Sequence, residues 1–61
     1  DAYVNMGVIY EAQQQNTNAL KSYAKALVIL PEDRSPFMSL RDFSANQNLA
    51  RVYAYELQKK L

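Results

Sequence analysis

Apolar residues recur every three or four positions in the first half of the chain, on both sides of a short polar break. This spacing is typical of amphipathic α-helices that each bury one side. We expect a first helix from about Ala2 to Gln14 and a second from about Thr17 to Leu30. The short polar connection between them predicts that the two helices fold back on each other as an antiparallel hairpin.

The apolar spacing also predicts which side of each helix is buried. The predicted inward residues are Tyr3, Met6, Gly7 and Tyr10 in the first helix, and Ala19, Leu20, Tyr23, Ala26, Leu27 and Leu30 in the second. Lys21, Ser22 and Lys25 are expected to face water. A glycine inside a helix costs about 1 kcal/mol relative to alanine. We therefore interpret Gly7 as the place where the hairpin helices approach closely, opposite Ala19.

The ends of both helices carry recognisable signals. Asp1 can cap the first helix, and Asn16 or Thr17 can cap the second, because their side-chain oxygens can accept an unpaired backbone N–H. Pro31 is expected to end the second helix, since proline donates no backbone hydrogen bond and disfavours helical geometry in the residue before it. The charged residues that follow Pro31 form a predicted connector.

A third helix is predicted in the second half of the chain. Ser35 and Pro36 are a helix-start signal, with serine as N-cap and proline at the first helical position. One long helix from Pro36 to about Lys60 places Leu40, Phe43, Gln47, Ala50, Ala54, Leu57 and Leu61 on one side. The alternative is a short degenerate hairpin, with its turn near Asn48. We favour the long helix, as a cap on the hairpin that then projects beyond it.

The first half resembles a tetratricopeptide repeat, a helix-turn-helix unit of about 34 residues with aromatic, small and proline residues at set spacings. The residues that carry the resemblance are Tyr3, Met6, Gly7, Tyr10, Ala19, Tyr23, Ala26 and Pro31. Gln14 and Asn16 depart from the pattern near the turn. The resemblance implies an all-α fold, with residues 1–31 as one repeat and residues 32–61 as a degenerate repeat or capping helix. It also favours an intracellular location, although the compartment stays undetermined.

A second repeat begins in register and then departs from the pattern. Phe37 follows Tyr3 at the repeat length of about 34 residues. Arg41 then stands where the first unit has Gly7, and Tyr53 stands where it has Ala19. Because repeat units need neighbours to bury both of their faces, we expect the chain to be a piece of a longer repeat protein or to pair with another chain. Val52, Tyr53, Tyr55 and Leu57 are the candidate residues for such self-association.

The composition argues against catalysis. The chain has 61 residues, a net charge of +1, and neither cysteine nor histidine, so the usual metal ligands and the commonest acid–base catalyst are missing. One glycine in total leaves no phosphate-binding loop. No apolar run reaches the roughly 18 residues of a membrane span. We therefore expect a single domain that is not an enzyme, binds no cofactor or metal, and has no membrane partner.

The resemblance implies that the chain binds a protein or peptide, because the first helices of such repeats line a groove. The candidate groove residues are Val4, Asn5, Val8, Glu11, Met38, Ser39 and Asp42. Asn5 is similar to the asparagine of a clamp that holds chaperone carboxylates in one subtype, but Ser35 and Ser39 stand where that clamp has a lysine and an arginine. We therefore do not expect chaperone binding.

Two other functions stay open at this point. One is a purely structural role, as a repeat inside a solenoid or an oligomer. The other, less favoured, is RNA binding by a helical repeat, because pentatricopeptide repeats share the hairpin architecture. The basic residues near the hairpin are scattered and the net charge is small, so nucleic acid is not the expected partner.

Overall fold

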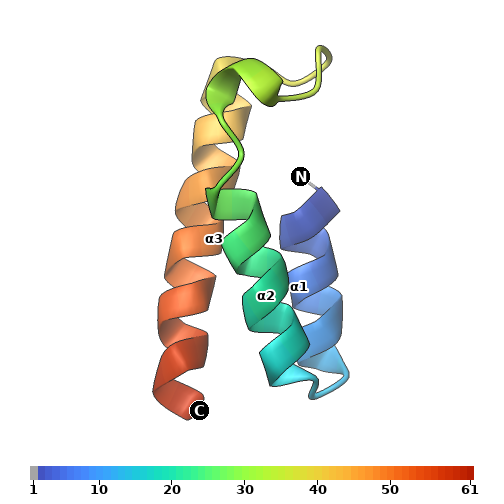
Figure 1. Cartoon of the computed structure of the whole chain (residues 1–61), viewed down its shortest axis with the longest axis vertical. Coiled ribbons are helices and arrows are strands. Elements are labelled where there is room, and N and C mark those ends of the chain that lie inside the picture. Colours follow the sequence, from blue (N-terminus) through green and yellow to red (C-terminus); the bar gives the residue numbers. More distant parts are fainter. Residues whose placement is uncertain (1) are drawn as a thin grey trace.

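Three α-helices and one short 3₁₀ helix make up the structure. The computed structural model describes residues 2–61. Its elements are α1 (Ala2–Ala12), α2 (Asn16–Leu27), the 3₁₀ helix η1 (Pro31–Asp33) and α3 (Leu40–Lys60). Helices α1 and α2 form an antiparallel hairpin, and α3 runs alongside α2 (Figure 1). The predicted all-α fold, with a hairpin and a long third helix in place of a second hairpin, is confirmed.

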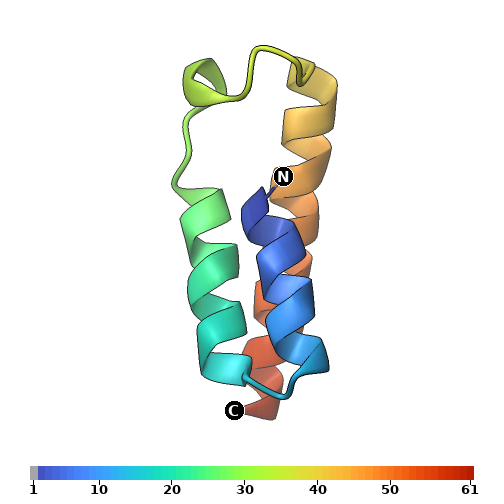
Figure 2. The same ribbon diagram turned by 90° about the vertical axis from the view of Figure 1, so that its right-hand side faces the viewer.

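Helix α2 lies at the centre of this arrangement. It packs against both α1 and α3, whereas α1 and α3 meet over a smaller region (Figure 2). The molecule is elongated, with extents of 33 × 17 × 14 Å. The part that extends beyond the hairpin is the linker with the beginning of α3, and the chain ends near the level of the α1–α2 turn. The predicted projection therefore lies at the opposite end of α3 from the one that we expected.

A left-handed residue ends α1 earlier than predicted. Gln14 has φ 61°, and the backbone N–H of Gln15 donates to the carbonyl of Tyr10 at 2.8 Å while that of Gln14 donates to Glu11 at 2.9 Å. These two bonds form a Schellman motif, which satisfies the last carbonyls of a helix and usually contains glycine. The helix therefore ends at Ala12, and the predicted N-cap at its other end, Asp1, lies outside the described residues.

Helix α2 also differs from its predicted bounds at both ends. Gln15, and not Asn16 or Thr17, is the N-cap, and it makes no side-chain capping bond. At the other end α2 stops at Leu27, three residues before the predicted Leu30. The chain beyond this end is held by α3, where the side-chain amide of Gln47 donates to the carbonyl of Ile29 at 2.9 Å.

Helix α3 begins at Leu40 and not at Pro36. Ser39 is the N-cap, and its side chain accepts a hydrogen bond from the backbone N–H of Asp42 at 3.0 Å. The predicted start signal forms a turn instead, in which the backbone N–H of Met38 donates to the carbonyl of Ser35. A serine followed by a proline fits both structures, and a second serine four residues later provides an equally good cap.

The buried core combines three alanines with Val4, Leu57 and the aromatic rings of Tyr23 and Phe43. Ala19, Ala26 and Ala50 are fully buried, which lets the three helices approach closely. Tyr23 is also fully buried, and its ring centroid lies 5.6 Å from that of Tyr53. One buried cluster contains Val4, Ala26 and Ala50, and a second contains Ala19, Tyr23 and Leu57.

Gly7 marks a close approach of α1 to α2, as predicted, and the group on α2 that comes nearest to it is the ring of Tyr23. A Cβ atom at Gly7 would lie 2.6 Å from Cδ1 and 2.7 Å from Cζ of Tyr23, well inside van der Waals contact. Ala19 instead packs with Tyr23 and Leu57. The missing side chain of Gly7 therefore makes room for an aromatic ring.

Several residues differ from the prediction in whether they face the core or the solvent. Tyr3, Met6, Leu30, Leu40 and Leu61 were predicted to face inward and are exposed. Ser22 was predicted to face water and is buried. Because α2 is covered by two helices, its buried side is wider than the apolar stripe, and a small serine fits within it.

Candidate functional site

One side of α1 is apolar and uncovered. Met6 is 42% exposed, Val8 46% and Ile9 56%, and Asn5 beside them is exposed as well. At 100° per residue, Asn5 falls between Val8 and Ile9 around the helix, and Met6 adjoins Ile9. We call these four residues the α1 outer face. Helix α2 covers only the opposite side of α1, where Val4 and Gly7 are buried.

The structure divides the groove residues that we predicted on α1. Asn5 and Val8 are exposed on the α1 outer face. Val4 is 5% exposed and packs with Ala26 and Ala50, so it is a core residue and offers no surface to a partner. The apolar periodicity misplaced Val4 because apolar residues occur on every side of α1.

Glu11 also has a role within the fold. The hydroxyl of Tyr23 donates to its carboxylate at 2.7 Å. Burial, followed by this hydrogen bond, raises the pKa of Tyr23 well above the usual tyrosine value, because both favour the neutral phenol. Glu11 therefore satisfies the one polar group of a buried ring, which explains an acidic residue on a side of α1 that contacts α2.

The other predicted groove residues belong to the linker and to the start of α3. Met38 is half-buried in the linker, and the side-chain amide of Asn46 lies 3.9 Å from its sulfur. Ser39 caps α3 and Asp42 is exposed in its first turn. Because Val4 is buried, it cannot share an exposed groove surface with Val8 and Met38.

The residues that we predicted for self-association are also divided. Val52 is 57% exposed and Tyr55 59% exposed, so both lie on the outer side of α3. Leu57 is 1% exposed and packs with Ala19 and Tyr23, and Tyr53 is half-buried against the same cluster. These two are core residues, so only Val52 and Tyr55 remain as surface candidates.

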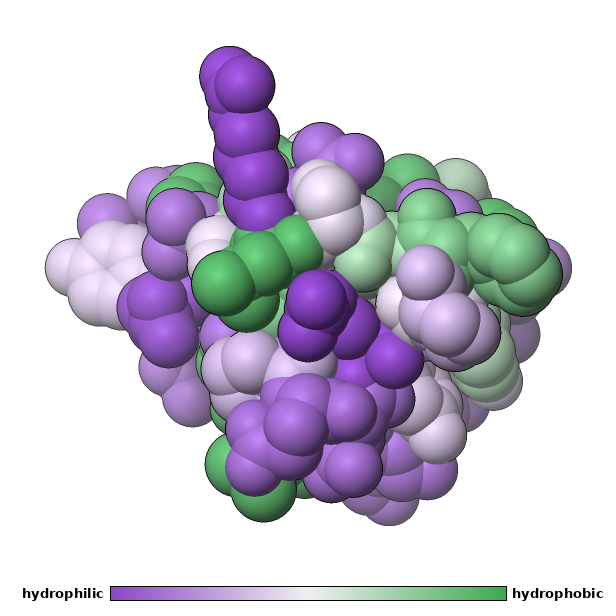
Figure 3. Space-filling model, turned by 90° about the horizontal axis from the view of Figure 1, so that it is seen from above, coloured by the Kyte–Doolittle hydropathy of each residue, from purple (hydrophilic) through white to green (hydrophobic). Residues whose placement is uncertain are grey.

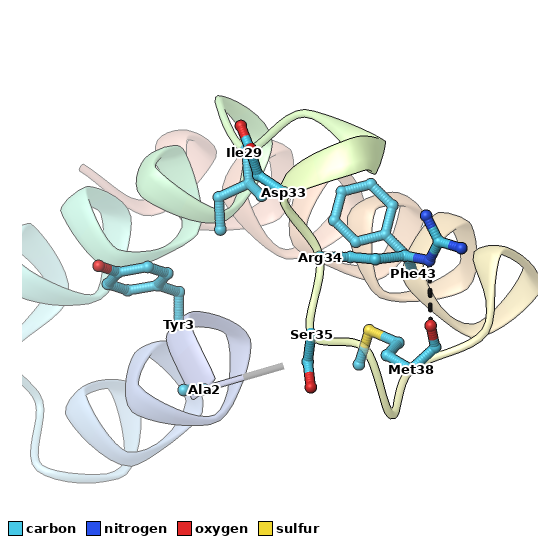
Figure 4. Close-up of a pocket in the computed structure, with 8 residues that line it drawn as sticks. All are labelled: Ala2, Tyr3, Ile29, Asp33, Arg34, Ser35, Met38 and Phe43. Atoms are coloured by element: carbon cyan, nitrogen blue, oxygen red, sulfur yellow. Dashed lines mark hydrogen bonds between the residues drawn. The ribbon is translucent and has the colours of Figure 1, made fainter.

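A pocket of about 220 Å³ lies where the start of α1, the linker and α3 meet (Figure 4). Its lining residues are Ala2, Tyr3, Ile29, Asp33, Arg34, Ser35, Met38 and Phe43. Figure 4 shows Tyr3 and Ile29 on one side of it and Met38 with Phe43 on the other. The sequence analysis missed this pocket, because its residues come from three separate segments and share no local spacing.

The charged side chains of the described residues are mostly separate from one another. Within residues 2–61 the single ion pair joins Glu56 and Lys59, at 3.9 Å on the exposed side of α3. The same part of the chain contains no cluster of acidic residues that could hold a metal ion. None of its helices is long and apolar enough to cross a membrane.

Comparison of the chain with known proteins finds no match among family models, curated proteins or solved structures.

Proposed function

We propose that this chain is a non-catalytic protein-interaction module that binds an apolar peptide or partner helix on the α1 outer face. The observation that carries the proposal is the uncovered apolar side of α1. A helix that is apolar all round normally lies in a protein interior. Apart from the hydroxyls of Tyr3 and Tyr10, only Asn5 and Glu11 are polar in α1, and Glu11 accepts a hydrogen bond from Tyr23. A partner that binds the α1 outer face would therefore bury apolar side chains.

The resemblance to tetratricopeptide repeats supports the same function, and we propose a relationship to that family. In such repeats the first helix of each hairpin lines the surface that binds a peptide, and α1 is the first helix here. Asn5 lies among the apolar residues of this face and can fix the register of a bound backbone, because its amide both donates and accepts hydrogen bonds.

A structural role in an oligomer is the second candidate. The observation that favours it is the exposure of Val52 and Tyr55 on the outer side of α3. This surface is less apolar than the α1 outer face, since Leu57 is buried, Tyr53 is half-buried, and Lys59 lies 4.3 Å from the ring centroid of Tyr55. A purely structural element predicts that substitutions here change the assembly and leave peptide binding unaltered.

Selection of peptides from a displayed random library, followed by titration calorimetry, tests the proposal. Val8→Glu and Ile9→Glu should each weaken a selected peptide by roughly tenfold or more, because each places a charge in an apolar contact. Val28→Glu is the matched control, since Val28 is 76% exposed near the end of α2 and lies outside the α1 outer face. Helical circular dichroism should be the same for all three variants.

The result that contradicts the proposal is equally definite. Either no peptide is enriched, or the enriched peptides bind the Val8→Glu and Val28→Glu variants equally well. The salt dependence separates peptide capture from RNA binding. Affinity for an apolar peptide should hardly change between low and high salt, whereas affinity for RNA falls steeply.

A further inference from the structure

A hydrogen-bonded turn in the linker displays one phenylalanine to solvent. Phe37 is 97% exposed. It lies in the turn Ser35–Met38, where the backbone N–H of Met38 donates to the carbonyl of Ser35 at 3.0 Å. The backbone N–H of Phe37 also donates to the hydroxyl of Ser35 at 3.3 Å. Pro36 restricts the backbone at the first central position of the turn.

Arg34 holds this turn in place from inside the linker. Its Nε donates to the carbonyl of Met38 at 3.0 Å, and its Nη1 donates to the carbonyl of Pro31 at 2.8 Å. The guanidinium thus joins both ends of the linker segment that contains Phe37. A side chain that is displayed on a restrained backbone loses less conformational freedom on binding, which favours association.

The apolar pocket lies directly beside the turn. Ser35 and Met38 belong to the turn and also line the pocket, together with Tyr3, Ile29 and Phe43. In the view from above, onto the end of the molecule that carries the linker, a hydrophobic side chain lies near the centre and others lie towards the upper right, with hydrophilic side chains beside them (Figure 3). Phe37 does not line the pocket. This end of the molecule therefore carries an apolar cavity and, beside it, an exposed aromatic side chain.

We propose that two copies of this chain associate through this end, with Phe37 of each copy inserted into the pocket of the other. Because the turn and the pocket are adjacent, a two-fold axis brings both contacts together, with each copy supplying the same residues. The segment from Ser35 to Leu40 contains no charge, so the inserted turn brings no ionised group of its own into the pocket.

The charges at the rim of the pocket are self-complementary as well. Asp33 and Arg34 are adjacent, of opposite sign, and both line the pocket. Within the described residues the ion pair is Glu56 with Lys59, so neither Asp33 nor Arg34 is engaged in one. A two-fold axis sets Asp33 of one copy against Arg34 of the other, twice, which favours a pair of copies over other neighbours.

The expected contact area makes this dimer weak. A phenylalanine buries about 200 Å², so two rings with matching pocket walls bury roughly 800 Å², below the about 1,200 Å² of a standard stable interface. We therefore expect association in the high-micromolar range, with exchange between monomer and dimer. The monomer should predominate in dilute solution.

Sedimentation velocity over a range of concentrations up to roughly 1 mM tests the proposal at the affinity expected for so small an interface. The unaltered chain should shift from monomer to dimer as its concentration rises. Phe37→Ser should weaken association by roughly 100-fold or more, because both phenylalanine contacts are lost and each is worth about tenfold or more. Leu61→Ser is the matched control, since Leu61 is also an exposed apolar residue, at 65%, and lies at the other end of α3.

A mixing experiment shows whether Phe37 enters the pocket of the partner copy. Ile29→Glu blocks the pocket and leaves Phe37 intact, so this variant alone should stay monomeric. An equimolar mixture of Ile29→Glu with Phe37→Ser keeps one intact pocket and one intact phenylalanine. It should associate about tenfold more weakly than the unaltered chain but about tenfold more tightly than either variant alone, a difference that concentration-dependent NMR shifts can measure. Tyr3→Glu serves as a second pocket variant if circular dichroism shows that Ile29→Glu unfolds.

Three outcomes overturn the proposal. The first is a chain that stays monomeric at all concentrations, and the second is a dimer that Phe37→Ser leaves unchanged. The third is a mixture of the two variants that associates no more tightly than either variant alone. Peptide binding to the α1 outer face does not depend on Phe37, so failure of this proposal and failure of the proposed function are distinguishable.

Discussion

Gly7 is the position where one added methyl group should have the clearest effect. A Cβ atom there would lie 2.6 Å from Cδ1 of Tyr23, and Tyr23 is fully buried among Ala19, Leu57 and Tyr53. The ring cannot withdraw without disturbing these neighbours and the hydrogen bond to Glu11. Overpacking of this kind typically costs about 1–3 kcal/mol.

Gly7→Ala also stabilises the helix itself, and this gain in stability must be subtracted from the cost of overpacking. Alanine favours a helix over glycine by about 1 kcal/mol. Because the obstructing atoms belong to an aromatic ring with no space behind it, we expect the upper part of the overpacking range to apply. Gly7→Ala should therefore lower the free energy of unfolding by about 1–2 kcal/mol, and the melting temperature by about 4–8 °C for each kcal/mol.

Thermal unfolding followed by circular dichroism measures this effect. Asn5→Ala is the control for helix propensity, because Asn5 is exposed on the same helix, and it should raise the melting temperature slightly. In a double-mutant cycle, Tyr23→Leu should relieve the clash, so that Gly7→Ala becomes stabilising in that background. The reasoning is refuted if Gly7→Ala raises the melting temperature of the otherwise unaltered chain as Asn5→Ala does.

Three further predictions concern the turn, the buried phenol and the third helix. Gln14→Gly should stabilise the chain by about 1 kcal/mol in urea unfolding, because glycine adopts a positive φ without strain; an unchanged or lower stability contradicts this. Tyr23→Phe should cost about 1 kcal/mol near neutral pH through the lost bond to Glu11. Because the pKa of Tyr23 is raised in the fold, the unfolded chain loses the phenol proton at a lower pH than the folded chain does. The contribution of Tyr23 to the free energy of unfolding is therefore fully present below about pH 10 and should fall as the pH rises further. Tyr23→Phe should show a smaller fall over the same pH range, and an identical fall would argue against the raised pKa. Ser39→Ala should cost about 1 kcal/mol as the loss of an N-cap, more than Ser35→Ala, and the reverse order would place the start of the helix at the earlier serine.

Much of the architecture could be predicted because it depends on local spacing. Two apolar repeats separated by polar residues predict a helical hairpin, and the continued spacing after Leu40 favours one long helix over a second, short hairpin. The side of α1 that faces inward could not be predicted, because Val4, Met6 and Ile9 are all apolar and any of them could form the core. The contact with Ala26 and Ala50 decides in favour of Val4.

The helix ends and the pocket depend on contacts between distant residues. Gln47 binds the carbonyls of Ala26 and Ile29 from another helix, and no pattern within α2 indicates that it ends at Leu27. The pocket likewise requires the start of α1 to lie beside the linker. Its most accessible neighbour, Phe37, was interpreted only as the opening residue of a second repeat. The sequence therefore predicted the helices and left their mutual contacts open.

The most direct test of the central claim is the titration of an isotopically labelled chain with a selected peptide, followed by NMR. The proposed function predicts that amide shifts concentrate at Asn5, Met6, Val8 and Ile9 of the α1 outer face, while those of Val52 and Tyr55 stay in place. Shifts confined to α3, with the α1 outer face unchanged, would contradict it.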